Sequence, residues 1–399
     1  MKAILASASL IVLLSIACQG GNDASPAPAS PSAATEEERR SLVVFLRPEA
    51  DDSEMSAGVI HIGSDLSGSD AVQVTPSDVR ASYVGLGERE GTTFLYYLAA
   101  AETGDSFSLE ARDLATGETT TLASFESNAG RASRGSLSAD GRYIAFSHDY
   151  GIDLFDLATN AQRNILSGDR AGCERGPISR CYSYSLPAWS PDGRLLLMTK
   201  TYWEGGAAMV VDPFQEEPQE MGEPFSADMS AAIAAWSPTS DAWCGYGHYG
   251  GPSGLYVSQQ PEWQPRNLLP EYETPGLNAP WRSVSDCVWL DGDRIAFATT
   301  AAEPEGDGSQ YSTSVSIYDL AAGAVTPIAD LGVSSSPVIS PNLFLVPGTS
   351  TLLFNDRQLG QPGALDTTNG TRTDILKVGD VVVGVTQPVA LPKKTVPAG

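Results

Sequence analysis

The chain has 399 residues, a formal net charge of −25 at pH 7 and three histidines. Such acidity argues against binding to nucleic acid and against electrostatic adhesion to anionic lipid. About 360 residues follow the first forty, which is long for one ordinary core, although repeated β-structures reach this length as single units. The charge shows no local cluster, so it indicates solubility and not a cation site.

The first 17 residues are expected to be a secretory signal peptide. Lys2 precedes an apolar stretch that ends at Ala17, and this stretch is shorter than the roughly 20 residues that a membrane-spanning helix needs. The segment Leu14–Cys18 (LSIAC) resembles the lipobox of bacterial lipoproteins, whose cysteine is lipidated and becomes the new N-terminus. The family prefers leucine where Ser15 stands, and an ordinary cleaved signal is the alternative interpretation. Lipidation of Cys18 is the favoured one.

Residues 18–40 are expected to be the lipidated N-terminus and a flexible spacer. They are rich in Gly, Ser, Ala and Pro and almost lack large apolar side chains. Such a segment cannot bury enough surface to offset the entropy of ordering it, and its proline content keeps it extended. The resemblance places the protein in the bacterial cell envelope, anchored to a membrane through the lipid, at the outer membrane, in the periplasm or on the cell surface.

Four cysteines remain besides Cys18, an even number that suits disulfides in an oxidising compartment. They are Cys173, Cys181, Cys244 and Cys287. Four cysteines allow three pairings. The short Cys173–Cys181 loop closes easily, and Cys244 would then pair with Cys287. A zinc site is the weaker alternative, because the sequence has no Cys-x-x-Cys motif.

A motif recurs at intervals of about 50 residues, which is the period of a repeat architecture. Its clearest copy is Ala188–Arg194 (AWSPDGR), followed by an apolar strand. Related copies contain Asp140, Trp236 and Trp289, and the last anchor is expected at Val338–Pro341. In each copy a strand ends, a tight turn reverses the chain, and an apolar strand runs back.

A second motif follows the anchors at Arg112–Gly117, Phe155–Asn160 and Tyr318–Gly323. Each copy indicates a strand, a turn with Gly or Asn where a positive φ is needed, and another strand. Each unit therefore holds four antiparallel strands in about 40 to 55 residues, which describes one blade of a β-propeller.

The number of units is seven when their second strands are counted. These strands are expected near 42–47, 93–99, 143–148, 195–200, 242–248, 294–299 and 351–355. The first unit lacks a first strand, whereas Val381–Pro388 is strand-like and follows the last unit. The predicted fold is therefore all-β, a seven-bladed propeller over residues 41–392 with a tail at 393–399. Its C-terminal strand closes the first blade, which hides strand edges that would otherwise aggregate.

The Ala188–Arg194 motif resembles the repeats of TolB-like and WD-repeat-like propellers, and the resemblance covers about residues 41–390. It implies the fold far more strongly than a function, because propellers of this kind include binding scaffolds as well as accessory domains of peptidases. TolB-like proteins also carry an N-terminal α/β domain for which the sequence before residue 41 has no room. The role of TolB is therefore not carried over.

Three less repetitive segments, 167–186, 245–254 and 270–286, are the expected functional surfaces, because rigid scaffolds present function in their loops. Arginine and aromatic side chains are typical of binding hot spots. The residues of these segments that we take as binding candidates are Arg175, Arg180, Tyr182, Tyr184, His248, Tyr249, Trp281 and Arg282. The alternative is that the segments are only long connections between strands.

Repeated side chains are expected to be structural. Trp189, Trp236 and Trp289 occupy equivalent positions, where large aromatic rings would fill the wedge between neighbouring blades. A second repeated set consists of Asp140, Asp192 and Asp293. We expect these aspartates to accept backbone hydrogen bonds in turns and not to bind calcium.

The histidines His61, His148 and His248 fall in different blades. A propeller could bring them together at its central channel, but three unrelated histidines are the simpler interpretation. The sequence shows no catalytic constellation, and we expect no cofactor and no metal. The favoured function is a monomeric, non-catalytic binding or scaffold module for a protein, peptide or glycan. The alternative is a lyase or glycosidase with its site at the channel mouth.

Overall fold

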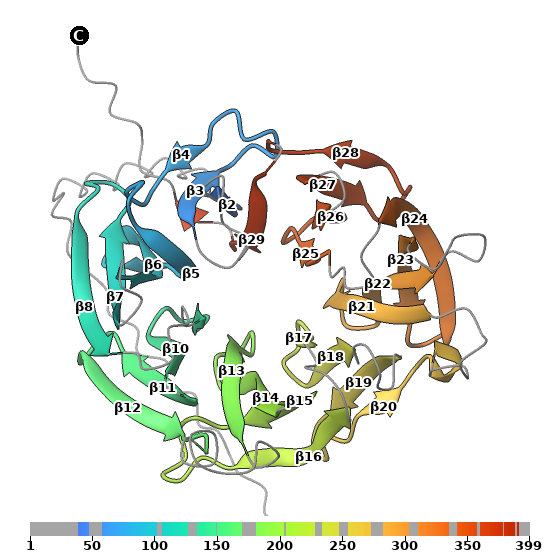
Figure 1. Cartoon of the computed structure of the whole chain (residues 1–399), viewed down its shortest axis with the longest axis horizontal. Coiled ribbons are helices and arrows are strands. Elements are labelled where there is room, and N and C mark those ends of the chain that lie inside the picture. The colour runs from blue at the N-terminus through green and yellow to red at the C-terminus, as the bar shows by residue number, and fades with distance from the viewer. Residues whose placement is uncertain are drawn as a thin grey trace, which may run out of the picture. The chain divides into compact units, whose positions relative to one another are not determined.

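The computed structural model describes residues 39–47, 58–101, 106–126, 134–148, 150–169, 181–202, 205–227, 234–246, 254–272, 282–302, 310–334, 341–356, 360–377, 379–387 and 389–390. Within them the strands form seven four-stranded antiparallel sheets in a ring (Figure 1), together with one two-stranded sheet. The predicted seven-bladed propeller is therefore confirmed.

In the first three blades the strands follow one another from the centre of the ring outward. Blade one consists of β29 (Val381–Val385), β2 (Val43–Arg47), β3 (Val59–Gly63) and β4 (Val72–Gln73). Blade two consists of β5 (Arg80–Arg89), β6 (Thr92–Ala100), β7 (Ser106–Asp113) and β8 (Thr119–Glu126). Blade three consists of β9 (Gly135–Leu137), β10 (Tyr143–His148), β11 (Gly151–Asp156) and β12 (Ala161–Leu166).

The other four blades have the same order. Blade four consists of β13 (Tyr182–Trp189), β14 (Leu196–Tyr202), β15 (Gly205–Val211) and β16 (Glu220–Ala227). Blade five consists of β17 (Ala234–Trp236), β18 (Ala242–Tyr246), β19 (Leu255–Gln259) and β20 (Arg266–Asn267). Blade six consists of β21 (Arg282–Trp289), β22 (Arg294–Ala302), β23 (Tyr311–Asp319) and β24 (Ala324–Ser334). Blade seven consists of β25 (Phe344–Leu345), β26 (Thr351–Asp356), β27 (Gln361–Asp366) and β28 (Arg372–Asp374).

The C-terminal strand closes the ring, as predicted. β29 supplies the innermost strand of blade one and pairs with β2, where Phe45 faces Val382. Blade seven contributes a further link, because the buried amide of Asn355 donates to the carbonyl of Val382 (2.9 Å) and accepts from its N–H (2.8 Å). Arg47 on β2 also forms two hydrogen bonds to Asp380.

A short pair of strands adds to this closure. β1 (Arg39–Arg40) pairs with β30 (Val389–Ala390). The sequence placed Arg39 and Arg40 in the spacer, whereas in the structure they pair with the residues that follow the closing strand.

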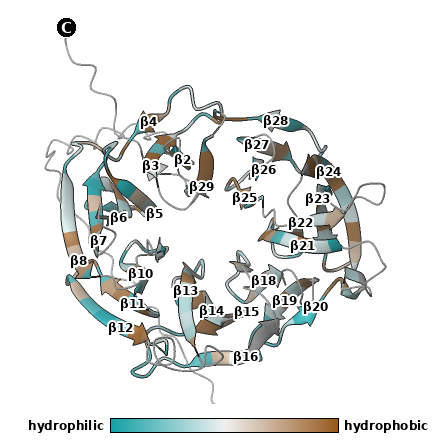
Figure 2. Cartoon of the chain, in the orientation of Figure 1, coloured by the Kyte–Doolittle hydropathy of each residue, from teal (hydrophilic) through white to brown (hydrophobic). Residues whose placement is uncertain are grey.

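The hydrophobic core lies in the interfaces between neighbouring blades. Second strands are buried on both faces, as β10 shows with Ile144, Ala145 and Phe146, whereas the outer strand β12 is mostly exposed. Figure 2 shows this contrast, with polar colour along much of β12 and β20. Strands buried on both faces lose alternation and read as continuous apolar runs, which is why the sequence located the second strands best.

The three tryptophans fill wedges between blades, as predicted. The indole Nε1 of Trp189 donates to the carbonyl oxygen of Ser136 (3.1 Å), that of Trp236 to Ala188 (2.9 Å), and that of Trp289 to Ala235 (3.1 Å). In each case the acceptor belongs to the first strand of the preceding blade. The rings therefore fix each blade to the one before it, by packing and by a directed hydrogen bond.

The turn aspartates are confirmed in two blades and corrected in a third. Asp140 and Asp192 accept the backbone N–H groups of Arg142 and Arg194. In blade six the acceptor is Asp291 and not the predicted Asp293, because the turn there is one residue shorter and brings the earlier carboxylate under the N–H groups.

The anchor of blade seven was also misplaced. The sequence predicted it at Val338–Pro341, but the first strand is β25 and its turn runs over 346–350. Leu345 pairs with Leu352 just as Trp189 pairs with Leu196, so Leu345 holds the tryptophan position of this blade. The Ser-Pro pair at 340–341 resembled the anchor but precedes the strand.

A disulfide joins Cys244 on β18 to Cys287 on β21 and links blades five and six. Cys181 is disulfide-bonded as well, but Cys173, its predicted partner, lies outside the described residues. One short 3-10 helix, η2 (Pro270–Tyr272), precedes β21. In the part of the chain that the structure describes, no helix is long and apolar enough to cross a membrane.

Candidate functional site

The direction of the strands gives the ring two different faces. Second and fourth strands of every blade end at the same face, which we call the loop face; β12 and β20 end there, and β13 and β21 begin there. The opposite face carries the tight turns after the first and third strands, such as the turn at Asp140, and we call it the turn face.

The described strand ends that flank the three predicted binding segments lie at the loop face. Tyr182 and Tyr184 lie at the start of β13, and Arg282 at the start of β21. The remaining predicted site residues lie outside the described residues, and they are Cys18, Arg175, Arg180, His248, Tyr249 and Trp281.

A cation surrounded by aromatic rings lies where β13 and β14 reach the loop face. The ammonium Nζ of Lys200 is 4.6 Å from the ring centroid of Tyr182, 5.6 Å from that of Tyr184 and 5.8 Å from that of Tyr202. Strand register produces this cluster, because Tyr184 pairs with Lys200 and Tyr182 with Tyr202. Ammonium groups are attracted to the faces of aromatic rings at such distances.

A carboxylate completes this tyrosine–lysine cluster. Glu220 on β16 accepts from Lys200 Nζ (2.9 Å) and from the hydroxyl of Tyr184 (2.5 Å). Burial disfavours the ammonium of Lys200, but the hydrogen bond and charge of Glu220 outweigh it and raise the pKa of Lys200 above 10.5. Burial, and then Glu220, raise the pKa of Tyr184. The cluster therefore holds Lys200 in its charged form, paired with Glu220, and Tyr202 is 39% exposed.

A similar pair lies at the start of blade six. The guanidinium of Arg282 is 5.1 Å from the ring centroid of Tyr272, and it donates to the Tyr272 hydroxyl at 3.4 Å. Within the described residues, the loop face thus carries three cation–aromatic contacts that involve predicted residues, two made by Lys200 and one by Arg282. Sequence reasoning missed Lys200, Tyr202 and Glu220. The alternation Tyr-x-Tyr on β13 and Lys-x-Tyr on β14 could have indicated the first two, but nothing local points to Glu220.

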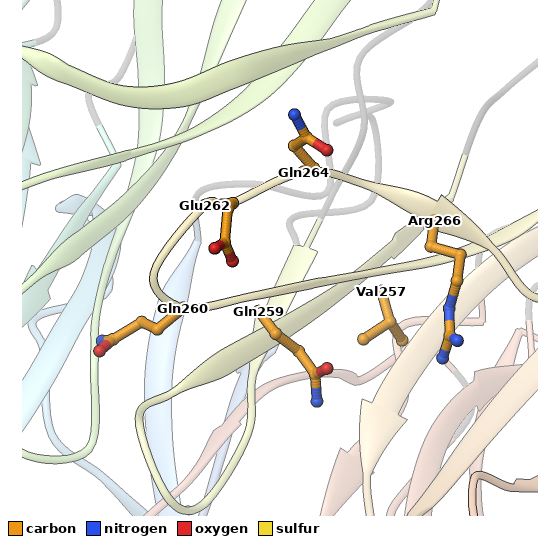
Figure 3. Close-up of a pocket in the computed structure, with 6 residues that line it drawn as sticks. All are labelled: Val257, Gln259, Gln260, Glu262, Gln264 and Arg266. Carbon is orange, nitrogen blue, oxygen red and sulfur yellow. The ribbon is translucent and has the colours of Figure 1, made fainter.

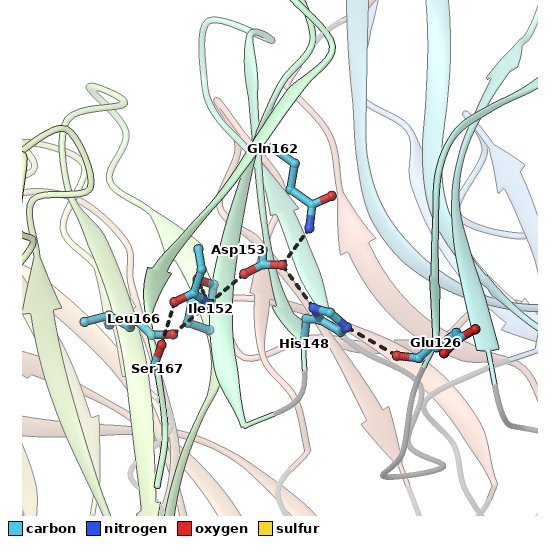
Figure 4. Close-up of polar contacts among 8 residues, drawn as sticks. Glu126, His148, Ile152, Asp153, Gln162, Leu166 and Ser167 are labelled. Carbon is cyan, nitrogen blue, oxygen red and sulfur yellow. Dashed lines mark hydrogen bonds and ion pairs between the residues drawn. The ribbon is translucent and has the colours of Figure 1, made fainter. Parts of the chain in front are cut away.

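A polar network lies at the loop face of blade three (Figure 4). The buried carboxylate of Asp153 accepts from His148 Nδ1 (3.0 Å), Gln162 Nε2 (2.7 Å) and Asn164 Nδ2 (2.7 Å). The other ring nitrogen of His148 faces the carbonyl of Glu126 in blade two, at 3.4 Å. The network orients His148 between the two blades.

His61 belongs to a different environment. Its ring stacks on Phe45 with centroids 5.3 Å apart, and its Nδ1 donates to the carbonyl of Val59 at 3.2 Å. Burial lowers the pKa of His61, and the hydrogen bond to Val59 only partly offsets this. His61 and His148 thus have separate sets of contacts, and His248 lies outside the described residues. Among the described residues, no group of three or more His, Cys, Asp or Glu could hold a metal ion.

Two hollows open at the turn face. The first has a volume of about 320 Å³. Polar side chains from β19, from β20 and from the turn between them line it, as Figure 3 shows. They are Gln259, Gln260, Glu262, Gln264 and Arg266, beside Val257. The second, of about 470 Å³, lies between blades six and seven, and its mixed lining includes the apolar residues Leu290, Ile317, Ile328 and Leu345.

Comparison with solved structures finds propellers of the same kind at low sequence identity. An oligogalacturonate lyase in complex with manganese has a TM-score of 0.55 and 13% identity, over 85% of this chain and 86% of that chain. A candidate 6-phosphogluconolactonase from Bacteroides uniformis has a TM-score of 0.53 and 15% identity, over 87% and 99%. TolB from Acinetobacter baumannii matches with a TM-score of 0.41 and 17% identity, over 77% and 69%.

At such identities the likeness shows the fold alone, and it agrees with the propeller resemblance of the repeats. No protein-family model and no curated protein matches the sequence.

Proposed function

We propose that the protein is an exported, lipid-anchored propeller that works as a non-catalytic binding module of the cell envelope and takes a protein, peptide or glycan on its loop face. The observation that carries the proposal is the tyrosine–lysine cluster of Tyr182, Tyr184, Tyr202 and Lys200. Rigid aromatic rings are typical of binding hot spots, because they contact a ligand with little loss of side-chain entropy.

Export is supported by the disulfides, which persist in oxidising compartments and are rare in the cytosol. Lipid attachment at Cys18 rests on the resemblance to the lipobox. A Cys18→Ala variant is expected to leave the membrane fraction of a bacterial host after cell lysis. A variant that still sediments with membranes contradicts the anchor without touching the proposed binding face.

Site-specific photocrosslinking tests the binding face. A photoreactive phenylalanine derivative at Tyr202 probes the loop face of blade four, and the same residue at Phe214 probes the turn face of that blade. The two native side chains are matched, being 39% and 45% exposed. Irradiated envelope fractions are expected to give a defined adduct from position 202 and none from 214. Equal labelling at both positions, or none at 202, contradicts the proposal.

One observation favours the second candidate, a propeller enzyme. The carboxylate of Asp153 accepts from His148 Nδ1 at the loop face, and an oriented histidine of this kind is one component of many proton-transfer sites. The structural neighbours include an oligogalacturonate lyase. Incubation of the purified protein with oligogalacturonate separates the candidates. Unsaturated product that forms with the native chain and is lost in a folded His148→Ala variant would establish the enzyme and displace the binding module.

A further inference from the structure

The wedge between blades three and four is filled by three aromatic rings. Trp189 packs against Phe214 with centroids 6.0 Å apart and against Tyr143 at 6.2 Å, and Tyr143 contacts Phe214 at 5.0 Å. Trp189 comes from the first strand of blade four, Phe214 from the turn after its third strand, and Tyr143 from the second strand of blade three.

The same three positions lack aromatic side chains between blades six and seven. Strand register makes Leu345 the equivalent of Trp189, and Arg294 the equivalent of Tyr143. Thr368 follows Asp366 as Phe214 follows Asp212, and both aspartates accept the N–H two residues on. All three replacements line the hollow of about 470 Å³. The hollow therefore occupies the place that rings fill between blades three and four.

A smaller residue at the tryptophan position does not by itself leave a hollow. Blade three has Leu137 at the tryptophan position, and Leu137 packs against Gly85 of blade two. A Cβ built on Gly85 would lie only 2.5 Å from the Cβ of Leu137. Close approach of the two blades thus fills that wedge. Blade six has Val288 and Leu290 at the positions of Gly85 and Gly87, so the close backbone approach that glycine allows between blades two and three is not available there.

We propose that the hollow between blades six and seven binds an aromatic ring that carries a hydrogen-bond donor, of the indole type, presented by a small molecule or a peptide. Its volume falls in the range of small-molecule sites, about 300–1,000 Å³. Leu290, Ile317, Ile328 and Leu345 are the apolar residues of its lining, against which the ring can pack. The site lies on the turn face and is independent of the proposed binding face.

The rim of the hollow is suited to accept hydrogen bonds. The hydroxyls of Thr349, Ser350 and Thr367 already donate, to Val346 O, Asp366 Oδ1 and Ser350 O respectively. Their oxygens keep acceptor capacity toward a ligand. In three other wedges an indole N–H donates to the backbone carbonyl of the residue just before the tryptophan position of the preceding blade. Val288, just before Trp289, holds this position in blade six, so its carbonyl is the corresponding acceptor for the wedge between blades six and seven.

Titration of the full chain with indole, followed by ligand-observed NMR and calorimetry, tests the site. Two variants rebuild the filled wedge: Leu345→Trp restores the tryptophan and Thr368→Phe the counterpart of Phe214. Each is expected to weaken indole binding at least tenfold. Ala158→Phe is the matched control, because Ala158 is the exposed counterpart of Thr368 in blade three, and it should bind indole like the native chain.

Thr368 is exposed in a turn, so Thr368→Phe is expected to fold even if the larger change at 345 disturbs the blade; circular dichroism checks both. Absence of indole binding to the native chain overturns the proposal. So does binding that both folded variants retain, or binding of a hexose in place of indole.

Discussion

The indole N–H of Trp236 donates a 2.9 Å hydrogen bond to the carbonyl oxygen of Ala188, and so ties blade five to the innermost strand of blade four. The ring also contacts Trp263 edge-on, with centroids 5.7 Å apart. A propeller has no core shared by all its blades, so its cohesion is the sum of such wedge contacts between neighbours.

Replacement of Trp236 by leucine is expected to destabilise the protein by about 2–4 kcal/mol, since it leaves a cavity and removes a hydrogen bond. Trp236→Phe keeps an aromatic ring without the N–H, and a loss of about 1–2 kcal/mol is expected. Urea unfolding followed by tryptophan fluorescence measures both. Equal losses in the two variants would show that packing is irrelevant at this wedge.

Asn355 should be essential for ring closure, because its amide pairs with both backbone groups of Val382 at a buried site. Asn355→Ala leaves a buried N–H and carbonyl unpaired, with an expected cost of about 2–4 kcal/mol. Hydrogen exchange at Val382 should accelerate together with that of β29. Thr368→Ala, in an exposed turn of the same blade, serves as the control. An unchanged exchange rate at Val382 contradicts this role.

The buried imidazole of His61 should make stability fall in mild acid. Burial lowers the pKa of His61 below its usual 6.5, and Arg47, Asp380 and Lys377 add smaller effects. The folded state then binds fewer protons than the unfolded chain, so stability is complete above about pH 6.5 and declines as the pH falls below it.

Urea unfolding at about pH 7.5 and about pH 5.5 measures this decline. His61→Gln removes the titrating group, and the variant should lose less stability between the two pH values than the native chain. An identical loss in both proteins assigns the decline to other groups.

Glu220→Gln should lower the pKa of Tyr184, because the carboxylate raises it together with burial. The pKa of Lys200 should fall as well, since Glu220 is what keeps it above 10.5 against the effect of burial. Ultraviolet titration of tyrosine and NMR of the lysine side chain follow the two groups. Titration curves that match those of the native chain would mean that Glu220 has little electrostatic effect in solution.

The fold could be predicted because each blade repeats a local pattern. Continuous apolar runs fixed the second strands, and the need to close the ring identified Val381–Val385 as the first strand of blade one. The anchor of blade seven was misplaced because Leu345 stands at the tryptophan position, and the turn after it lacks the Asp-Gly pair of the copies at Asp140, Asp192 and Asp291. A Ser-Pro pair nearby matched the motif better than the true strand did.

The candidate site could be predicted only in part. Tyr182 and Tyr184 were found because they lie in an irregular, arginine-rich segment. Glu220 could not be found from the sequence. Lys200 pairs with Ala207 on β15, and Glu220 pairs with β15 beyond an irregularity in the β15–β16 register, so residue spacing does not indicate that the two side chains meet. The hollow between blades six and seven depends on residues from two blades, and no single repeat reveals it.

Ring closure also sets the order in which the chain can mature. The N–H of Leu42 is bonded to the hydroxyl of Thr386, across 344 positions of sequence. The inner edge of β2 therefore stays without its strand until β29 has been synthesised, and an uncovered edge is a template for mispairing. We expect a nascent or truncated chain that ends before residue 381 to need a chaperone, and late delivery of β29 to be the step that commits the propeller to its native state.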